Sequence, residues 1–116
     1  MGTGLTYSPE ELYEKIKVAM AEARARGWTI VKGKTIDYLN NTCCPVAAYV
    51  IINKAPDDYL RLCNSSIVLT AKKLLGVTDG QLISLMDGID GKTVFRVHSE
   101  WVALGERIRG LMEEAA

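Results

Sequence analysis

The side chains with the greatest potential for chemistry are Cys44, which directly precedes Pro45, and His98, the only histidine in the sequence. Proline is favoured at the first position of a helix, so Cys44 is predicted to stand at a helix N-terminus. There the unpaired backbone N–H groups and the positive end of the helix dipole would lower the pKa of the thiol. His98 follows a predicted strand, Thr93 to Val97, and its imidazole could serve as a general base. One hypothesis is therefore a cysteine nucleophile at Cys44 assisted by His98.

This placement is similar to that in cysteine hydrolases of the papain and NlpC/P60 type, in which a later strand contributes the histidine. The present chain departs from them because it is short, has no Gly-His motif and offers no obvious third residue to orient the imidazole. A buried free cysteine is also a common small apolar filler of protein cores. We therefore interpret Cys44 as a packing residue and keep a cysteine-dependent hydrolase or transferase as an alternative.

Metal and nucleotide sites have weaker support. A zinc set of three thiolates and one imidazole can be counted from Cys43, Cys44, Cys63 and His98. Adjacent cysteines rarely chelate one tetrahedral ion, however, and no C-x-x-C spacing is present. The glycines are too dispersed to match a nucleotide-binding fingerprint. We expect neither a metal nor a cofactor.

A second candidate site spans residues 71–87, where an alanine, a turn glycine and a capped second segment follow one another. It resembles the helix-turn-helix of phage-repressor-type regulators over about twenty residues. The resemblance implies that basic residues contact phosphates and polar residues read bases, which nominates Lys72, Lys73, Gln81 and Ser84. Asp79 and Asp87 would repel phosphate, and a plain helix pair needs the same glycine and cap. We favour the helix pair and keep DNA binding as an alternative.

Local signals predict the helices that position these residues. Ser8 and Glu11 form a capping box around Pro9, and apolar residues then recur on one face, which predicts a helix over 9–26 that stops at Gly27. A shorter helix over 45–52 is apolar nearly all round, so we expect it at the buried centre of the domain.

The second half of the chain predicts further helices. Pro56 opens a helix or turn, residues 64–66 offer caps for a helix over 67–75, and Thr78 with Gln81 makes a second capping box. We expect this capped helix to end before Gly88. A last helix, carrying Trp101, Leu104 and Ile108, is predicted to be capped by Ser99.

The β content is predicted to be small. Trp28 to Val31 is rich in β-branched residues, and Thr35 to Tyr38 could return as a second strand of a hairpin or form part of an irregular loop. Pairing of Trp28–Val31 with Thr93–Val97 is the other arrangement we consider.

Composition limits the class of protein. The 116 residues are 48% hydrophobic, which suffices for one core without metals or disulfides. Fourteen basic and fourteen acidic side chains balance, so no overall field attracts nucleic acid or an anionic membrane. Three cysteines, two of them adjacent, fit a reducing cytoplasm better than a disulfide framework. Residues 1–7 show no basic segment followed by an apolar stretch, and the longest apolar run is about a third of a bilayer span, so we expect neither secretion nor membrane insertion.

A pattern that begins at Cys43 resembles one found in small uncharacterised bacterial and phage proteins. It comprises Cys43-Cys44-Pro45-Val46-Ala47-Ala48, Leu75-Gly76-Val77-Thr78, Gly88-Ile89-Asp90-Gly91 and Leu104-Gly105-Glu106-Arg107-Ile108-Arg109. The resemblance implies a prokaryotic or phage accessory protein and transfers no catalytic residue. In physical terms, Gly88 and Gly91 would let a helix end and a turn form.

These observations together predict a mainly α fold, a compact bundle of about five or six short helices with a minor two-stranded β element. Residues 1–7 are expected to form a disordered tail and residues 8–116 one globular domain. The expected function is that of a non-enzymatic protein-binding or regulatory accessory module in the cytoplasm, with no membrane association. A protein partner is expected, and self-association is a further hypothesis.

Overall fold

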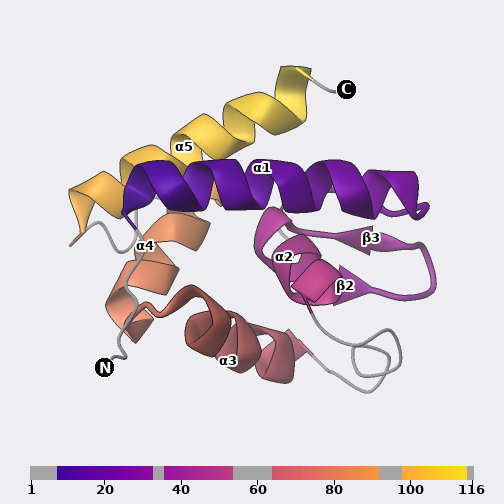
Figure 1. Ribbon diagram of the computed structural model, residues 1–116, viewed down its shortest axis with the longest axis horizontal. Coiled ribbons are helices and arrows are strands. Elements are labelled where there is room, and N and C mark those ends of the chain that lie inside the picture. Colours follow the sequence, from indigo (N-terminus) through magenta and orange to yellow (C-terminus); the bar gives the residue numbers. More distant parts are fainter. Residues whose placement is uncertain (1–7, 33–35, 54–63, 92–97, 115–116) are drawn as a thin grey trace.

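The computed structural model describes residues 8–32, 36–53, 64–91 and 98–114. Within them the chain forms five helices and a three-stranded sheet (Figure 1). The helices are α1 (Pro9–Ala25), α2 (Pro45–Asn53), α3 (Asn64–Leu75), α4 (Asp79–Asp90) and α5 (Ser99–Glu114). The strands are β1 (Thr29–Ile30), β2 (Ile36–Asp37) and β3 (Thr42–Cys43). The prediction of a mainly α fold with a minor β element is confirmed, although the sheet has three strands and not two.

Three expectations lie outside the described residues. They are the tail over 1–7, the helix or turn after Pro56 and the strand over Thr93–Val97, together with any pairing of that strand.

Helix α1 begins as its capping box predicts. The Ser8 hydroxyl accepts a hydrogen bond from the Glu11 backbone N–H, and the Glu11 carboxylate accepts one from the Ser8 N–H, at 3.2 and 3.1 Å. Both bonds satisfy N–H groups that a helix start leaves unpaired. The helix ends at Ala25, one residue earlier than expected, and Gly27 turns the chain at a φ of +97°. Its inner face buries Leu12, Ile16, Ala19, Met20 and Ala23.

Strands β1 and β2 do not pair with each other, as the hairpin that was one of the alternatives for residues 28–38 would require. β3 lies between them, parallel to β1 and antiparallel to β2, so that Cys43 is the partner of both Ile30 and Ile36. The polar residues before Cys43 concealed this strand, because their types are those of a turn. The returning strand therefore pairs with β3 and not with β1.

Helix α2 is the buried centre of the domain, as predicted. Every residue from Pro45 to Ile51 is buried, and the helix packs against α1 on one side and α3 on the other. A helix that is apolar on all faces can be stable only when it is enclosed in this way.

Two helix boundaries in the second half differ from expectation. Residues 64–66 are the first turn of α3 and are not caps preceding it. α4 starts at the predicted Thr78–Gln81 capping box but continues through Gly88 and ends at Gly91, which adopts the left-handed conformation at a φ of +76°. The prediction of a stop before Gly88 is wrong because this glycine lies where α5 crosses α4, so it serves helix packing.

Helix α5 packs chiefly along α4 and also contacts α1. Trp101, Leu104 and Ile108 are buried, as the sequence predicts. Helix α5 begins one residue earlier than predicted. The carbonyl of His98 accepts hydrogen bonds from the N–H groups of Trp101 and Val102 at 2.9 and 3.1 Å. His98 therefore occupies the cap position, and Ser99 is the first helical residue.

Candidate functional site

The Cys44 thiol is buried where β3 passes into α2. Its side chain is 5% exposed, and its sulfur accepts a hydrogen bond from the Ala47 N–H at 3.4 Å. Burial raises the pKa of Cys44 to about 11, and the nearby Asp90 carboxylate contributes to the rise. The N–H groups of Ala47 and Val46 act in the opposite direction. The predicted helix-start effect is therefore present, but the expected lowering of the pKa is wrong because desolvation outweighs it.

The neighbouring Cys43 is also a buried free thiol. Its pKa is raised to about 12, first by burial and then by the proximity of Cys44. Both sulfurs are therefore protonated near neutral pH, and a protonated thiol is a poor nucleophile and a poor metal ligand.

His98 has structural contacts at the start of α5. Its backbone N–H donates to the Ser84 hydroxyl at 3.4 Å, while its carbonyl caps the helix. Figure 1 shows α5 beginning at the left edge of the molecule and α2 beginning near its centre. Among the described residues, the Asp90 carboxylate acts on the Cys44 thiol and disfavours the thiolate.

The zinc set is incomplete within the described structure. Across residues 8–32, 36–53, 64–91 and 98–114, no three side chains of His, Cys, Asp or Glu gather in a way that could hold a metal ion. Cys63, the fourth member of the set considered above, lies outside the described residues.

The side chains nominated for DNA contact are largely committed to contacts within the protein. Lys72 pairs with Asp79, with 2.9 Å between Nζ and Oδ1, and so ties the end of α3 to the start of α4. The Gln81 side-chain oxygen accepts a hydrogen bond from the Thr78 N–H in the capping box. Ser84 is fully buried and accepts a hydrogen bond from His98.

Lys73 is exposed on α3, and Ile83 on α4 is an apolar residue with 44% exposure. α3 packs against α2, and α4 packs mainly against α5. The interpretation of residues 71–87 as a tight helix pair therefore describes the short connection between α3 and α4. Each of these helices packs mainly against another helix, α2 or α5.

Sequence reasoning did not identify a leucine at the tip of the β2–β3 connection. Leu39 is 95% exposed. It lies in a turn over residues 38–41, which we name the Leu39 turn. The Asp37 carboxylate accepts hydrogen bonds from the backbone N–H groups of Leu39 and Asn40 and from the Asn40 side-chain amide, at 3.0, 3.3 and 2.8 Å.

Contacts with residues 28 and 29, which follow α1, hold the Leu39 turn in place. The Thr29 N–H donates to the Asn41 carbonyl at 2.8 Å. The Tyr38 ring meets the Trp28 ring edge to face, with 6.2 Å between their centroids. The signal that could have revealed this feature is an apolar side chain among residues typical of turns, Asp37, Asn40 and Asn41.

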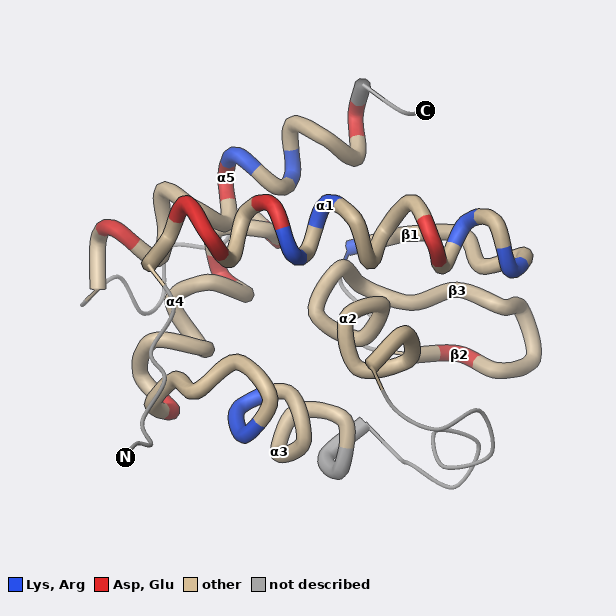
Figure 2. The backbone as a smooth tube through the Cα atoms, in the orientation of Figure 1, with Lys and Arg blue, Asp and Glu red and all other residues tan. Residues whose placement is uncertain are grey.

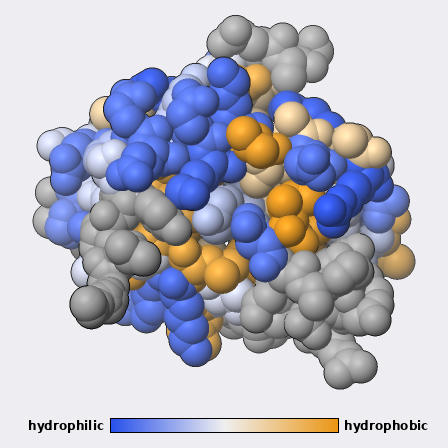
Figure 3. Space-filling model, in the orientation of Figure 1, coloured by the Kyte–Doolittle hydropathy of each residue, from blue (hydrophilic) through white to orange (hydrophobic). Residues whose placement is uncertain are grey.

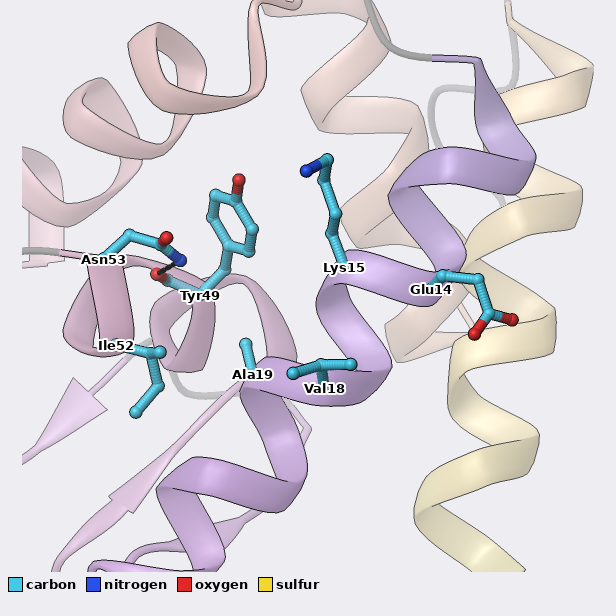
Figure 4. Close-up of a pocket in the computed structure, with 7 residues that line it drawn as sticks. All are labelled: Glu14, Lys15, Val18, Ala19, Tyr49, Ile52 and Asn53. Atoms are coloured by element: carbon cyan, nitrogen blue, oxygen red, sulfur yellow. Dashed lines mark hydrogen bonds between the residues drawn. The ribbon is translucent and has the colours of Figure 1, made fainter.

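A hollow of about 320 Å³ lies between α1 and α2, and we name it the α1/α2 groove. It is lined by Glu14, Lys15, Val18 and Ala19 from α1 and by Tyr49, Ile52 and Asn53 from α2 (Figure 4). Val18 is 60% exposed on the polar face of α1. Figure 3 shows apolar surface in this region, flanked by hydrophilic side chains. The sequence signal for this groove was Val18, an apolar residue outside the stripe that predicts the core.

Two further findings concern the class of protein. No described helix is both long and apolar enough to cross a membrane. Comparison with protein-family models, with curated proteins and with solved structures finds no match to this chain.

Proposed function

We propose that the chain is a non-catalytic, protein-binding accessory module of a regulatory kind, and that the Leu39 turn contacts its partner. The observation that carries this proposal is the 95% exposure of Leu39 on a turn fixed by Asp37. Single exposed apolar residues are common on protein surfaces. Leu39 differs because the backbone that presents it is held by hydrogen bonds on both sides of the turn.

The energetics support a binding role for this side chain. Moving a leucine side chain from water into an apolar pocket stabilises a complex by about 1.5–3 kcal/mol. A preformed turn loses little conformational entropy on binding, so more of that gain is retained. The partner is therefore a protein with an apolar pocket that admits one branched aliphatic side chain. The free thiols of Cys43 and Cys44 are consistent with a partner in a reducing compartment such as the cytoplasm.

Photo-crosslinking tests the proposal. The chain carrying p-benzoyl-phenylalanine in place of Leu39 is irradiated in an extract of the source cells in three parallel samples: without competitor, with excess wild-type chain and with excess Leu39→Ser chain. We expect one discrete adduct that excess wild-type chain suppresses and that Leu39→Ser does not. The matched control carries the same crosslinker in place of Leu69, a leucine on α3 with 50% exposure.

The proposal fails if position 39 gives no discrete adduct, if Leu39→Ser competes as well as the wild type, or if position 69 gives the same adduct. Circular dichroism of Leu39→Ser must match the wild type, so that a loss of competition reflects the lost side chain.

The two alternatives have no specific contact in their favour. A cysteine-dependent reaction at Cys44 needs an accessible thiolate, whereas this thiol is buried and its pKa is raised to about 11. DNA contact through residues 71–87 needs Lys72 and Gln81 to leave their present partners. Salt-dependent binding of duplex DNA would revive the second alternative.

A further inference from the structure

We propose that the open edge of β1 binds an extended, acidic segment of a partner protein. The segment pairs with β1 as an added strand and places an aliphatic side chain in a hollow between β1 and α5. No residue of this site belongs to the Leu39 turn, and binding at one does not require binding at the other.

The first argument is the hydrogen bonding of β1, which is an outer strand of the sheet. The Thr29 N–H donates to the carbonyl of Asn41 at 2.8 Å. The Val31 N–H donates to the carbonyl of Cys43, also at 2.8 Å. Backbone groups alternate in direction along a strand, so the N–H and the carbonyl of Ile30 face the edge away from β3. Within the part of the chain that the structure describes, these two groups of Ile30 have no hydrogen-bond partner.

The exposure of β1 and the two residues after it leaves this edge accessible. Thr29 and Lys32 are exposed, and Ile30 and Val31 are half-buried. An unpaired N–H and carbonyl at a strand edge match the carbonyl and N–H of another extended backbone. A helix cannot offer such groups from its middle, because its own backbone is paired internally. The edge therefore selects an extended segment.

A hollow of about 360 Å³ adjoins this edge, and we name it the β1/α5 hollow. It is lined by Ile30, Val31 and Lys32 and, from α5, by Arg109, Met112 and Glu113. Figure 2 shows β3 on one side of β1 and the last turns of α5 toward the other. Successive side chains of an added strand point to opposite faces, so alternate ones can reach the hollow. Its apolar walls suit an aliphatic side chain at one of those positions.

The second argument is the charge around the hollow, which selects an acidic segment. Lys32 and Arg109 contribute two positive charges, and Glu113 contributes one negative charge. Among the described residues, neither Lys32 nor Arg109 forms an ion pair. The Arg109 guanidinium lies against Gly91 at the end of α4, so Lys32 is the freer of the two charges. A carboxylate on the bound segment can pair with it without displacing an acidic partner.

The same charges disfavour a second copy of this chain as the occupant. The edge of a second copy carries the same surplus of positive charge, and like charges brought together across an interface oppose binding. An acidic segment of another protein gains from that surplus.

Peptide display tests the proposal. A library of random peptides of about ten residues, long enough for one strand, is selected on the immobilised chain, with counter-selection on Ile30→Pro. Proline removes the outward N–H and is tolerated at the edge of a sheet. We expect enrichment of peptides that carry an acidic residue and have aliphatic residues at alternate positions.

Amide hydrogen exchange with one enriched synthetic peptide separates strand pairing from side-chain contact. Exchange of the Ile30 amide should slow at least about tenfold at saturation, because its N–H gains a hydrogen bond. The Val31 amide is an internal control, since it already donates to Cys43 and should change far less.

Titration calorimetry with the same peptide tests the charge. Lys32→Glu should weaken binding roughly fivefold, because it reverses an exposed charge beside the bound carboxylate. Lys17→Glu, at an exposed lysine of α1, is the matched control and should bind as the wild type does. Ile30→Val keeps the N–H and should also bind normally, whereas Ile30→Pro should lose at least about tenfold. Circular dichroism of each variant must match the wild type, and Lys32→Glu keeps the proposal testable if Ile30→Pro does not fold.

The proposal is overturned if no peptide is enriched, if the enriched peptides lack acidic residues, or if exchange of the Ile30 amide is unchanged by the peptide. Protection of the Ile30 amide that rises with concentration in the chain alone would assign the edge to a second copy and would also overturn it. Leu39→Ser should bind the selected peptide as the wild type does, so failure at this edge and failure at the Leu39 turn are distinguishable.

Discussion

Gly88 on α4 and Gly105 on α5 lie against each other where the two helices cross. A Cβ atom placed on Gly88 would stand 3.0 Å from the Cα of Gly105 and would overlap the carbonyl oxygen of Val102. A Cβ on Gly105 would stand 2.9 Å from the Cα of Gly88 and 2.8 Å from the backbone nitrogen of Ile89. Both positions therefore admit only a hydrogen atom.

The first prediction follows from this crossing. Gly88→Ala and Gly105→Ala should each lower the free energy of unfolding by roughly 1–3 kcal/mol, because the added methyl group meets backbone atoms that cannot move aside cheaply. Gly110→Ala is the control within α5, since nothing lies within 4 Å of its Cβ position. That change should raise stability by up to about 1 kcal/mol through better helix propensity. Urea unfolding checks all three, and a wild-type midpoint for Gly88→Ala would contradict the close crossing.

The second prediction concerns alkaline pH. In the folded chain the pKa of Cys44 is raised from an ordinary value near 9 to about 11, and that of Cys43 to about 12. Above pH 9 the unfolded chain loses these protons while the folded chain keeps them. Their contribution is therefore complete below pH 9 and is lost as the pH rises toward 11 and 12.

Cys44→Ser isolates this effect because its hydroxyl does not ionise in that range and still offers a cap acceptor at the start of α2. Its free energy of unfolding should fall less steeply between pH 9 and 11 than that of the wild type. The difference over the range is expected to be about 2–3 kcal/mol, from about 1.4 kcal/mol per pKa unit. If the free energy of unfolding fell equally steeply in both proteins, burial would not be keeping the Cys44 thiol protonated in the folded chain.

The third prediction contrasts an exposed leucine with a buried isoleucine. Leu39→Ser should change stability by less than about 0.5 kcal/mol, because the side chain makes few contacts in the folded chain. Ile51→Ala, at a fully buried position of α2, should cost about 2–5 kcal/mol. Thermal unfolding of both variants checks the contrast. A large loss for Leu39→Ser would mean that the residue supports the fold and would weaken its assignment to binding.

The fourth prediction concerns the contact between α1 and α5. The Arg107 guanidinium donates to the Glu10 carboxylate at 2.6 Å and lies over the Tyr13 ring, 4.1 Å from its centroid. Both charged side chains are substantially exposed, so a double-mutant cycle with Glu10→Gln and Arg107→Gln should give a coupling of at most about 1 kcal/mol. The coupling should shrink in high salt. A coupling energy that does not change with salt would show that Glu10 and Arg107 interact by something other than the attraction of their charges.

The candidate residues differ in how much of their role the sequence alone could indicate. Sequence nominated Cys44 for the helix-start effect on its pKa, and that effect is present, but burial reverses the outcome. The sequence also nominated Ser84 for its hydroxyl. Only the structure shows that this hydroxyl is buried and bound to the backbone N–H of His98. Leu39 and Val18 were passed over because only exposure distinguishes them from ordinary apolar residues.

The sequence by itself determined where the capped helices start and which of their faces is buried. The capping boxes at Ser8 and Thr78 join residues three apart, and helical periodicity repeats within a few residues, so both are local properties. Only the tertiary structure decided that β3 separates the two earlier strands, that Gly88 lies inside a helix and that the Cys44 thiol stays protonated. Each of these depends on segments distant in sequence, because contact with β1, with α5 or with a closed core changes the free energy of a residue more than its immediate neighbours do.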